Sequence, residues 1–135
     1  MQTDLSDGKK MGNSPVVNVT KSDLVSFDRS NYSDPEFSWK SAIGVTALGF
    51  LNSSTLGEKY KDNLFVGDYS HGNLYFFKKN KDRNDIEFGT NQTGLSDLVA
   101  EGMDEISKVD LGTGFDAITD IQTGPDGYTY IIIIQ

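Results

Sequence analysis

The chain has 135 residues, a formal net charge of -8 and no cysteine, and 36% of its residues are hydrophobic. This length and apolar content suffice for one domain with its own core. The negative charge argues against a nucleic-acid partner, whose phosphates attract Lys and Arg. No apolar run reaches the roughly 20 residues of a membrane-spanning helix. The absence of cysteine excludes disulfides, thiolate catalysis and cysteine metal sites.

The first 33 residues are expected to form a polar, weakly structured segment. Their apolar residues are scattered, so at most one marginal strand is expected there. The stretch Met1 to Lys10 is polar and lacks the apolar core of a signal peptide. Asp34-Pro35 then marks the start of a more ordered region, and we expect one domain over residues 34–135.

The segment from Asp62 to Phe77 predicts a β-hairpin. Its two apolar runs, Leu64 to Val66 and Leu74 to Phe77, flank a centre rich in Gly, Asp, Ser and Asn, the residue types that tight turns need. Each run is apolar at consecutive positions instead of alternating positions. Both faces of the hairpin should therefore be covered by other parts of the protein.

The flanking segments predict further strands and turns. Gly44 to Leu51 mixes β-branched with small residues, as in a strand where backbones crowd together. A loop over Asn52 to Asp62 follows that strand. Further on, Leu95 to Ala100 predicts a short helical turn that Gly102 ends, and Ile106 to Leu111 predicts a strand.

The end of the chain predicts a second hairpin. Gly124-Pro125-Asp126-Gly127 has proline, aspartate and glycine where a tight turn wants them. This turn joins a strand ending near Thr123 to a strand over Tyr128 to Ile134. No Lys or Arg protects the last strand, and an unpaired apolar edge of this kind is prone to aggregation.

Two stretches repeat each other: Val45-Thr46-Ala47-Leu48 aligns with Ile118-Thr119-Asp120-Ile121, and a turn and an apolar strand follow each. The repeat predicts an all-β fold, a partial β-propeller of about one and a half four-stranded antiparallel blades with inserted loops. Blade one covers about 34–111 and the half blade about 115–135. We expect the chain to be a fragment, or to be completed by self-association or by the remaining blades.

The ordered set of stretches resembles the C-terminal part of the glucose/sorbosone dehydrogenase family, whose soluble quinoprotein members are six-bladed β-propellers. The resemblance is carried by Asp34-Pro35-Glu36-Phe37-Ser38-Trp39, Gly44-Val45-Thr46-Ala47-Leu48-Gly49-Phe50, Leu64-Phe65-Val66-Gly67, Gly72-Asn73-Leu74-Tyr75, Ile118-Thr119-Asp120-Ile121 and Gly124-Pro125-Asp126-Gly127. It covers about Asp34 to Tyr130. It implies oxidation of a sugar outside the cytoplasm, with a hydride passing to pyrroloquinoline quinone and calcium assisting.

The resemblance also points to positions on the propeller's central face. Ser70, His71 and Thr119 are the candidate positions there. The family's histidine base lies in an earlier blade, so no catalytic residue is assigned in this chain. Quinone-binding members carry a basic residue at the position of Ser70 and two arginines at those of Ala117 and Thr119. The cations that would match the quinone carboxylates are therefore replaced here.

Three interpretations follow from the sequence. The first is a fragment of a quinone-dependent sugar dehydrogenase that is inactive alone, and the second is an extracellular, non-catalytic propeller that serves as a binding or interaction module. The third is a calcium-stabilised surface protein, since carboxylates bind hard cations. Its acidic residues are Asp97, Glu101, Asp104 and Glu105. Acids strung along a loop are more often solvated, so we assign no metal ligand.

Overall fold

The structure, a computed structural model, describes residues 27–28, 33 and 35–135. It consists mainly of antiparallel strands with very little helix, which confirms the predicted all-β class. Most of the N-terminal segment expected over residues 1–33 lies outside the described residues. Within the described part of the chain, no helix has the length and apolar character needed to cross a membrane.

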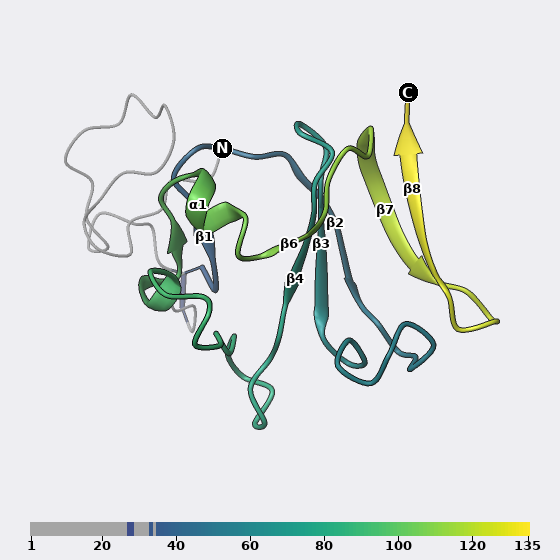
Figure 1. Cartoon of the computed structure of the whole chain (residues 1–135), viewed down its shortest axis with the longest axis horizontal. Coiled ribbons are helices and arrows are strands. Elements are labelled where there is room, and N and C mark those ends of the chain that lie inside the picture. Colours follow the sequence, from purple (N-terminus) through teal and green to yellow (C-terminus); the bar gives the residue numbers. More distant parts are fainter. Residues whose placement is uncertain (1–26, 29–32, 34) are drawn as a thin grey trace.

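The centre of the molecule is a four-stranded antiparallel sheet (Figure 1). Its strands are β2 (Val45–Phe50), β3 (Leu64–Asp68), β4 (Leu74–Phe77) and β6 (Asp110–Gly112), which lie side by side in that order. Strands β3 and β4 pair in register from Leu64 opposite Phe77 to Gly67 opposite Leu74. The hairpin predicted around this segment is confirmed.

Both faces of β3 and β4 are buried, as their consecutive apolar residues predict. On one face, Val66, Tyr75 and Phe77 pack in a cluster with Leu95, Ala100, Ile106 and Val109. On the other face, Phe65 and Leu74 pack with Ala47, Leu51, Ile118 and Ile121. Burial of each large apolar side chain contributes about 1.5–3 kcal/mol. The hairpin is therefore the shared wall of two cores.

The layer over the first face differs in part from the predicted elements. It contains β1 (Ser38–Trp39), which pairs in parallel with β5 (Val99–Ala100), the 3-10 helix η2 (Leu95–Asp97) and the short helix α1 (Met103–Ile106). The helical turn expected over Leu95 to Ala100 stops early, because Leu98 adopts a left-handed conformation with φ 62° and the next two residues pair with β1. Gly102 then precedes α1 instead of ending a helix.

The strand expected over Ile106 to Leu111 begins later than predicted. Ile106 is the last residue of α1, where its side chain enters the core. Val109 accepts a hydrogen bond from the amide of Phe76 at 2.8 Å, and strand β6 starts at the next residue. Ile106 and Val109 are buried in the first core cluster, but they lie in α1 and in the turn that follows it. Their apolar side chains are therefore not part of strand β6.

The second predicted hairpin is also confirmed. Strands β7 (Ala117–Thr123) and β8 (Thr129–Ile134) are antiparallel and are joined by the predicted turn, in which the amide of Gly127 donates to the carbonyl of Gly124. Figure 1 shows β7 between β2 and β8. A Cβ at Gly67 would lie 2.4 Å from Cγ2 of Ile118, so only glycine lets β7 pack this closely.

The internal repeat has a structural counterpart in two β-bulges. The register between β2 and β3 shifts between Val45 and Ala47, which places the extra residue at Thr46. The register between β7 and β8 shifts between Ile118 and Asp120, which places it at Thr119. Because β-bulges re-aim side chains and increase local twist, the two strand pairs have the same local irregularity at equivalent threonines.

Candidate functional site

A buried carboxylate, Asp68, organises the turn between β3 and β4. It is the last residue of β3 and is 0% exposed. Its Oδ1 accepts hydrogen bonds from the backbone amides of Gly44 at 3.0 Å and Ser70 at 2.8 Å. The first bond ties the turn to the chain entering β2, and the second closes the turn on itself.

The other oxygen of Asp68 faces two side chains. His71 Nδ1 lies 2.8 Å from Oδ2, and the Tyr75 hydroxyl donates to the same oxygen at 3.4 Å. An ionised carboxylate only accepts hydrogen bonds, so Nδ1 is the donor and the neutral ring has its acceptor at Nε2. The His71 side chain is 57% exposed. The contact with Asp68 fixes the orientation of the His71 ring.

The surroundings of Asp68 favour the protonated forms of two nearby side chains, Tyr75 and Asp110. Burial, and to a lesser extent the charges of Asp68 and Asp110, raises the pKa of Tyr75 to about 12. Burial is also the main cause that raises the pKa of Asp110, with the charge of Asp68 second. Oδ1 of Asp110 is buried and has no hydrogen-bond partner among the described residues. Tyr75 therefore remains a neutral hydroxyl donor at neutral pH.

The structure unites two of the three predicted site positions. Ser70 and His71 both bond to Asp68, the first through its amide and the second through its ring. Thr119 lies on β7, where its hydroxyl donates to the carbonyl of Ile132 at 3.1 Å, and it is not part of this cluster. The prediction overlooked Tyr75, which looks like a simple core residue in the sequence.

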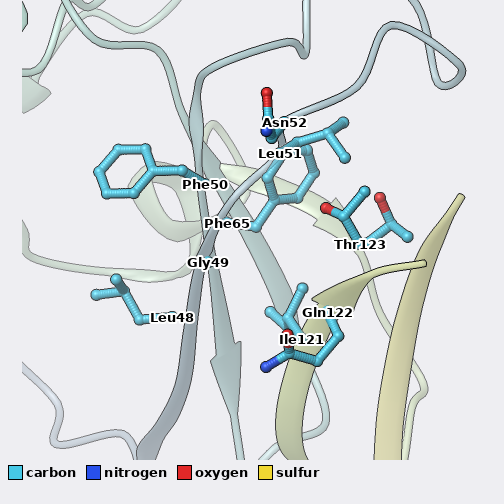
Figure 2. Close-up of a pocket in the computed structure, with 10 residues that line it drawn as sticks. Leu48, Gly49, Phe50, Leu51, Asn52, Phe65, Ile121, Gln122 and Thr123 are labelled. Atoms are coloured by element: carbon cyan, nitrogen blue, oxygen red, sulfur yellow. The ribbon is translucent and has the colours of Figure 1, made fainter. Parts of the chain in front are cut away.

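A second feature is an open pocket between β2 and the β7–β8 hairpin (Figure 2). Its volume is about 310 Å³. In Figure 2, Phe65 and Ile121 lie on the side of β2 that faces the β7–β8 hairpin, whereas the side chains of Leu48 and Phe50 extend from the opposite side of β2. The remaining lining residues are Gly49, Leu51, Asn52, Gln122, Thr123 and Thr129.

The polar groups of the pocket are all neutral. Gln122 donates its amide hydrogens to the carboxylate of Asp120, at 3.1 and 3.2 Å to the two oxygens. The Thr129 hydroxyl is buried without a hydrogen-bond partner among the described residues. A partly apolar pocket with amide and hydroxyl groups suits an uncharged ligand, because nothing in its lining would neutralise an ionic one.

The predicted acidic cluster is engaged mainly with its own loop. Asp97 accepts a hydrogen bond from the amide of Val99 at 3.1 Å, and Glu105 accepts one from the amide of Glu101 at 2.7 Å. The Glu101 carboxylate also lies 3.4 Å from Nζ of Lys40. Across the described ranges, no three or more side chains of the metal-binding types are grouped to hold an ion.

Comparison of the chain with models of protein families, with curated proteins and with solved structures finds no match. The chemistry of the two features above is therefore the basis for assigning a function. One feature is the Asp68 cluster at the turn, and the other is the neutral pocket at the junction between the sheet and the second hairpin.

Proposed function

We propose that the chain is part of a β-propeller that serves as a non-catalytic binding module outside the cytoplasm. The observation that carries this proposal is the neutral, partly apolar pocket between β2 and β7–β8. It lies where two copies of the repeated strand pair meet. Ligand pockets commonly form at such junctions, with apolar walls and a few polar groups that orient the ligand.

The repeated bulge supports the propeller architecture. Thr46 and Thr119 are bulged at equivalent places in the two strand pairs, and each pair begins a unit of antiparallel strands. In the first unit, β4 and β6 complete four strands. The second unit has β7 and β8. One and a half blades, with the boundaries at about 34–111 and 115–135, account for this arrangement.

The residues at and near the Asp68 cluster support the proposal that this chain does not bind the quinone. The cationic positions of quinone-binding members are occupied by Ser70, Ala117 and Thr119. The acidic side chain that contacts Ser70 and His71 is Asp68. A tricarboxylate quinone would meet negative charge here instead of guanidinium groups.

Calorimetric titration tests the binding module. We expect saturable binding of a neutral aldose such as glucose, weaker binding of gluconate, and no saturable binding of pyrroloquinoline quinone with calcium. Thr129→Val should weaken aldose binding by about two- to tenfold, because the unpartnered Thr129 hydroxyl is free to bond the ligand and one hydrogen bond contributes about 0.5–1.5 kcal/mol. Thr113→Val is the matched control, since Thr113 is exposed and does not line the pocket. Saturable quinone binding would contradict the proposal.

A second candidate is a fragment of a quinone-dependent sugar dehydrogenase. The contact between buried Asp68 and His71 favours it, because this contact orients a side chain at a position that the resemblance places on the central face of the propeller. The isolated chain is expected to be inactive, since the family's base lies in an earlier blade. Saturable quinone binding without dye reduction by aldose and calcium would support this candidate, whereas dye reduction by the isolated chain above a blank would contradict the expectation that it is inactive alone.

A further inference from the structure

The asparagines in the described part of the chain fall into two groups. Two of them, Asn52 and Asn91, are exposed, and their side chains make no hydrogen bond within the described ranges. The others take part in side-chain hydrogen bonds at 3.0, 3.3 and 2.8 Å, and they are Asn63, Asn73, Asn80 and Asn84. Only the first two asparagines therefore have an amide that is free to react.

The same two asparagines begin the pattern Asn-x-Ser/Thr. Asn52 is followed by Ser53-Ser54, and Asn91 is followed by Gln92-Thr93. None of the four bonded asparagines has Ser or Thr two residues later. This pattern, with any residue except proline in the middle, is the acceptor for N-linked glycosylation. Among the described asparagines, a free side chain and the acceptor pattern thus coincide.

The hydroxyl residues that complete the two patterns are also accessible. Ser54 and Thr93 are exposed, and neither hydroxyl makes a hydrogen bond within the described residues. Their carbonyls are the bonded groups: that of Ser54 accepts from the amide of Gly57, and that of Thr93 accepts from Nζ of Lys108. Since the hydroxyl is a required part of the pattern, both acceptor sites are complete at the surface.

Both sites lie in loops, where a bulky and hydrated glycan can be accommodated. Asn52 lies between β2 and β3, and Asn91 lies between β4 and η2. The two loops leave the central sheet at the same end (Figure 1), because Phe50 pairs opposite Leu64 and Leu64 pairs opposite Phe77. Neighbouring blades of a propeller pack through their sheets, so a complete propeller would also leave these loops at the surface.

We propose that Asn52 and Asn91 are N-glycosylation sites, each of which takes an oligosaccharide from a lipid-linked oligosaccharyl diphosphate. Nδ2 of the asparagine forms a bond to C1 of the first sugar, and the bond between C1 and the diphosphate oxygen breaks. The amide loses one proton to a base of the transferase, and the lipid diphosphate leaves. The inference rests on the proposed function for a location outside the cytoplasm.

Secretion of the full chain from a eukaryotic cell, with a cleavable secretion signal, tests both sites. Asn18→Gln and Asn31→Gln remove the two other acceptor patterns of the chain. Intact-protein mass spectrometry should then show two glycans, of which Ser54→Ala removes one and Thr93→Ala removes the other. An unmodified protein would overturn the proposal. A single glycan would overturn the assignment of the unoccupied asparagine.

Matched variants separate loss of the acceptor pattern from a change in loop conformation. Thr55→Ala and Thr90→Ala each remove a hydroxyl from an exposed residue of the same loops, outside the two patterns, and should retain both glycans. Ser54→Thr and Thr93→Ser preserve the pattern and should retain them as well. Loss of a glycan in any of these four variants would contradict the assignment of the acceptor pattern.

Glucose titration separates this inference from the proposed function. Asn52 lines the pocket, so its glycan begins at the pocket rim, but Ser54 and Thr93 do not line it. The double variant Ser54→Ala, Thr93→Ala therefore presents the pocket without glycans. If the parent has both glycans and the double variant binds no glucose, the glycosylation sites stand and the binding module is wrong. If the double variant binds glucose and the parent has no glycan, only the glycosylation sites are wrong.

Discussion

Strands β3 and β8 occupy the same place in the two repeated units but have opposite environments. Each follows a strand with a bulged threonine and pairs with it in the same antiparallel way. Four of the five residues of β3 are buried, whereas four of the six residues of β8 are exposed. Strand pairing is thus set locally by the hairpin, while burial depends on what packs against it.

One pair of equivalent residues shows why the environments differ. The bulge alignment places Gly67 of β3 opposite Ala47 and Ile132 of β8 opposite Asp120. Ile118 packs directly over Gly67, where any side chain would clash. Ile132 is branched and half exposed, so a further unit cannot approach β8 as closely as β7 approaches β3.

The largest expected difference between the two strands is at Phe65 and Tyr130, which the alignment makes equivalent. Phe65 is 1% exposed and packs in the second core, so Phe65→Ala should lower the free energy of unfolding by about 3–5 kcal/mol. Tyr130→Ala should lower it by less than about 1 kcal/mol. Urea denaturation measures both. Similar losses would mean that β8 is covered in solution.

Asp68 should show the next largest effect. Asp68→Ala leaves the amides of Gly44 and Ser70 and the Tyr75 hydroxyl without their acceptor, so it should lower the free energy of unfolding by about 2–4 kcal/mol. Ile133→Ala, at the equivalent position of β8, should cost about 1 kcal/mol or less. Denaturation of both variants provides the comparison. A loss below that of Ile133→Ala would show that Asp68 does not support the turn.

Replacing Asp110 or Asp126 with asparagine should change the stability of the protein in opposite directions at neutral pH. Burial raises the pKa of Asp110 above its usual 3.8, so its protonated form favours the fold and that contribution is lost as pH rises through the folded-state pKa. Asp110→Asn should therefore stabilise the protein at neutral pH. Hydrogen bonds, chiefly from Tyr130, lower the pKa of Asp126, so Asp126→Asn should slightly destabilise it at neutral pH. Thermal unfolding at pH 7 and at pH 3 measures the stability of both variants against that of the unsubstituted protein.

The smallest effect concerns two tyrosines whose pKa values are raised for different reasons. Burial raises the pKa of Tyr75 to about 12, whereas the hydrogen bond to Asp126 is the main cause for Tyr130. The stability that depends on neutral Tyr75 is fully present below pH 10 and is lost between pH 10 and about pH 12. Asp126→Asn should lower the pKa of Tyr130 and leave the pKa of Tyr75 unchanged. Ultraviolet titration measures both values. A shift of both would show that the two groups are coupled.

The sequence predicts the elements that local chemistry determines. Both hairpins follow from consecutive apolar residues around Gly, Asn, Asp and Pro, and they form between residues close in the chain. The parallel pairing of Ser38 with Val99 joins segments with no shared pattern, so the sequence does not predict it. Local propensity also misplaces the start of β6, because the core takes Ile106 from helix α1.

The candidate site is likewise predicted only where local residue types determine it. The turn that contains Ser70 and His71 is predicted from its residue types. The bonds to Asp68 come from Gly44, the residue before β2, and from Tyr75 of β4, and no spacing in the sequence indicates them. The pocket is also not predicted, because it arises from the packing of one repeated unit against the other.

The turn at Gly124 to Gly127 has a kinetic consequence. It closes a hairpin between adjacent segments, and hairpins of this kind form in about 1–10 μs. Strand β6 reaches β4 only after the long segment between Phe77 and Asp110 has been drawn together, which carries a larger loop-closure entropy. We therefore expect an early folding state in which both hairpins exist and the outer edge of β4 is still open.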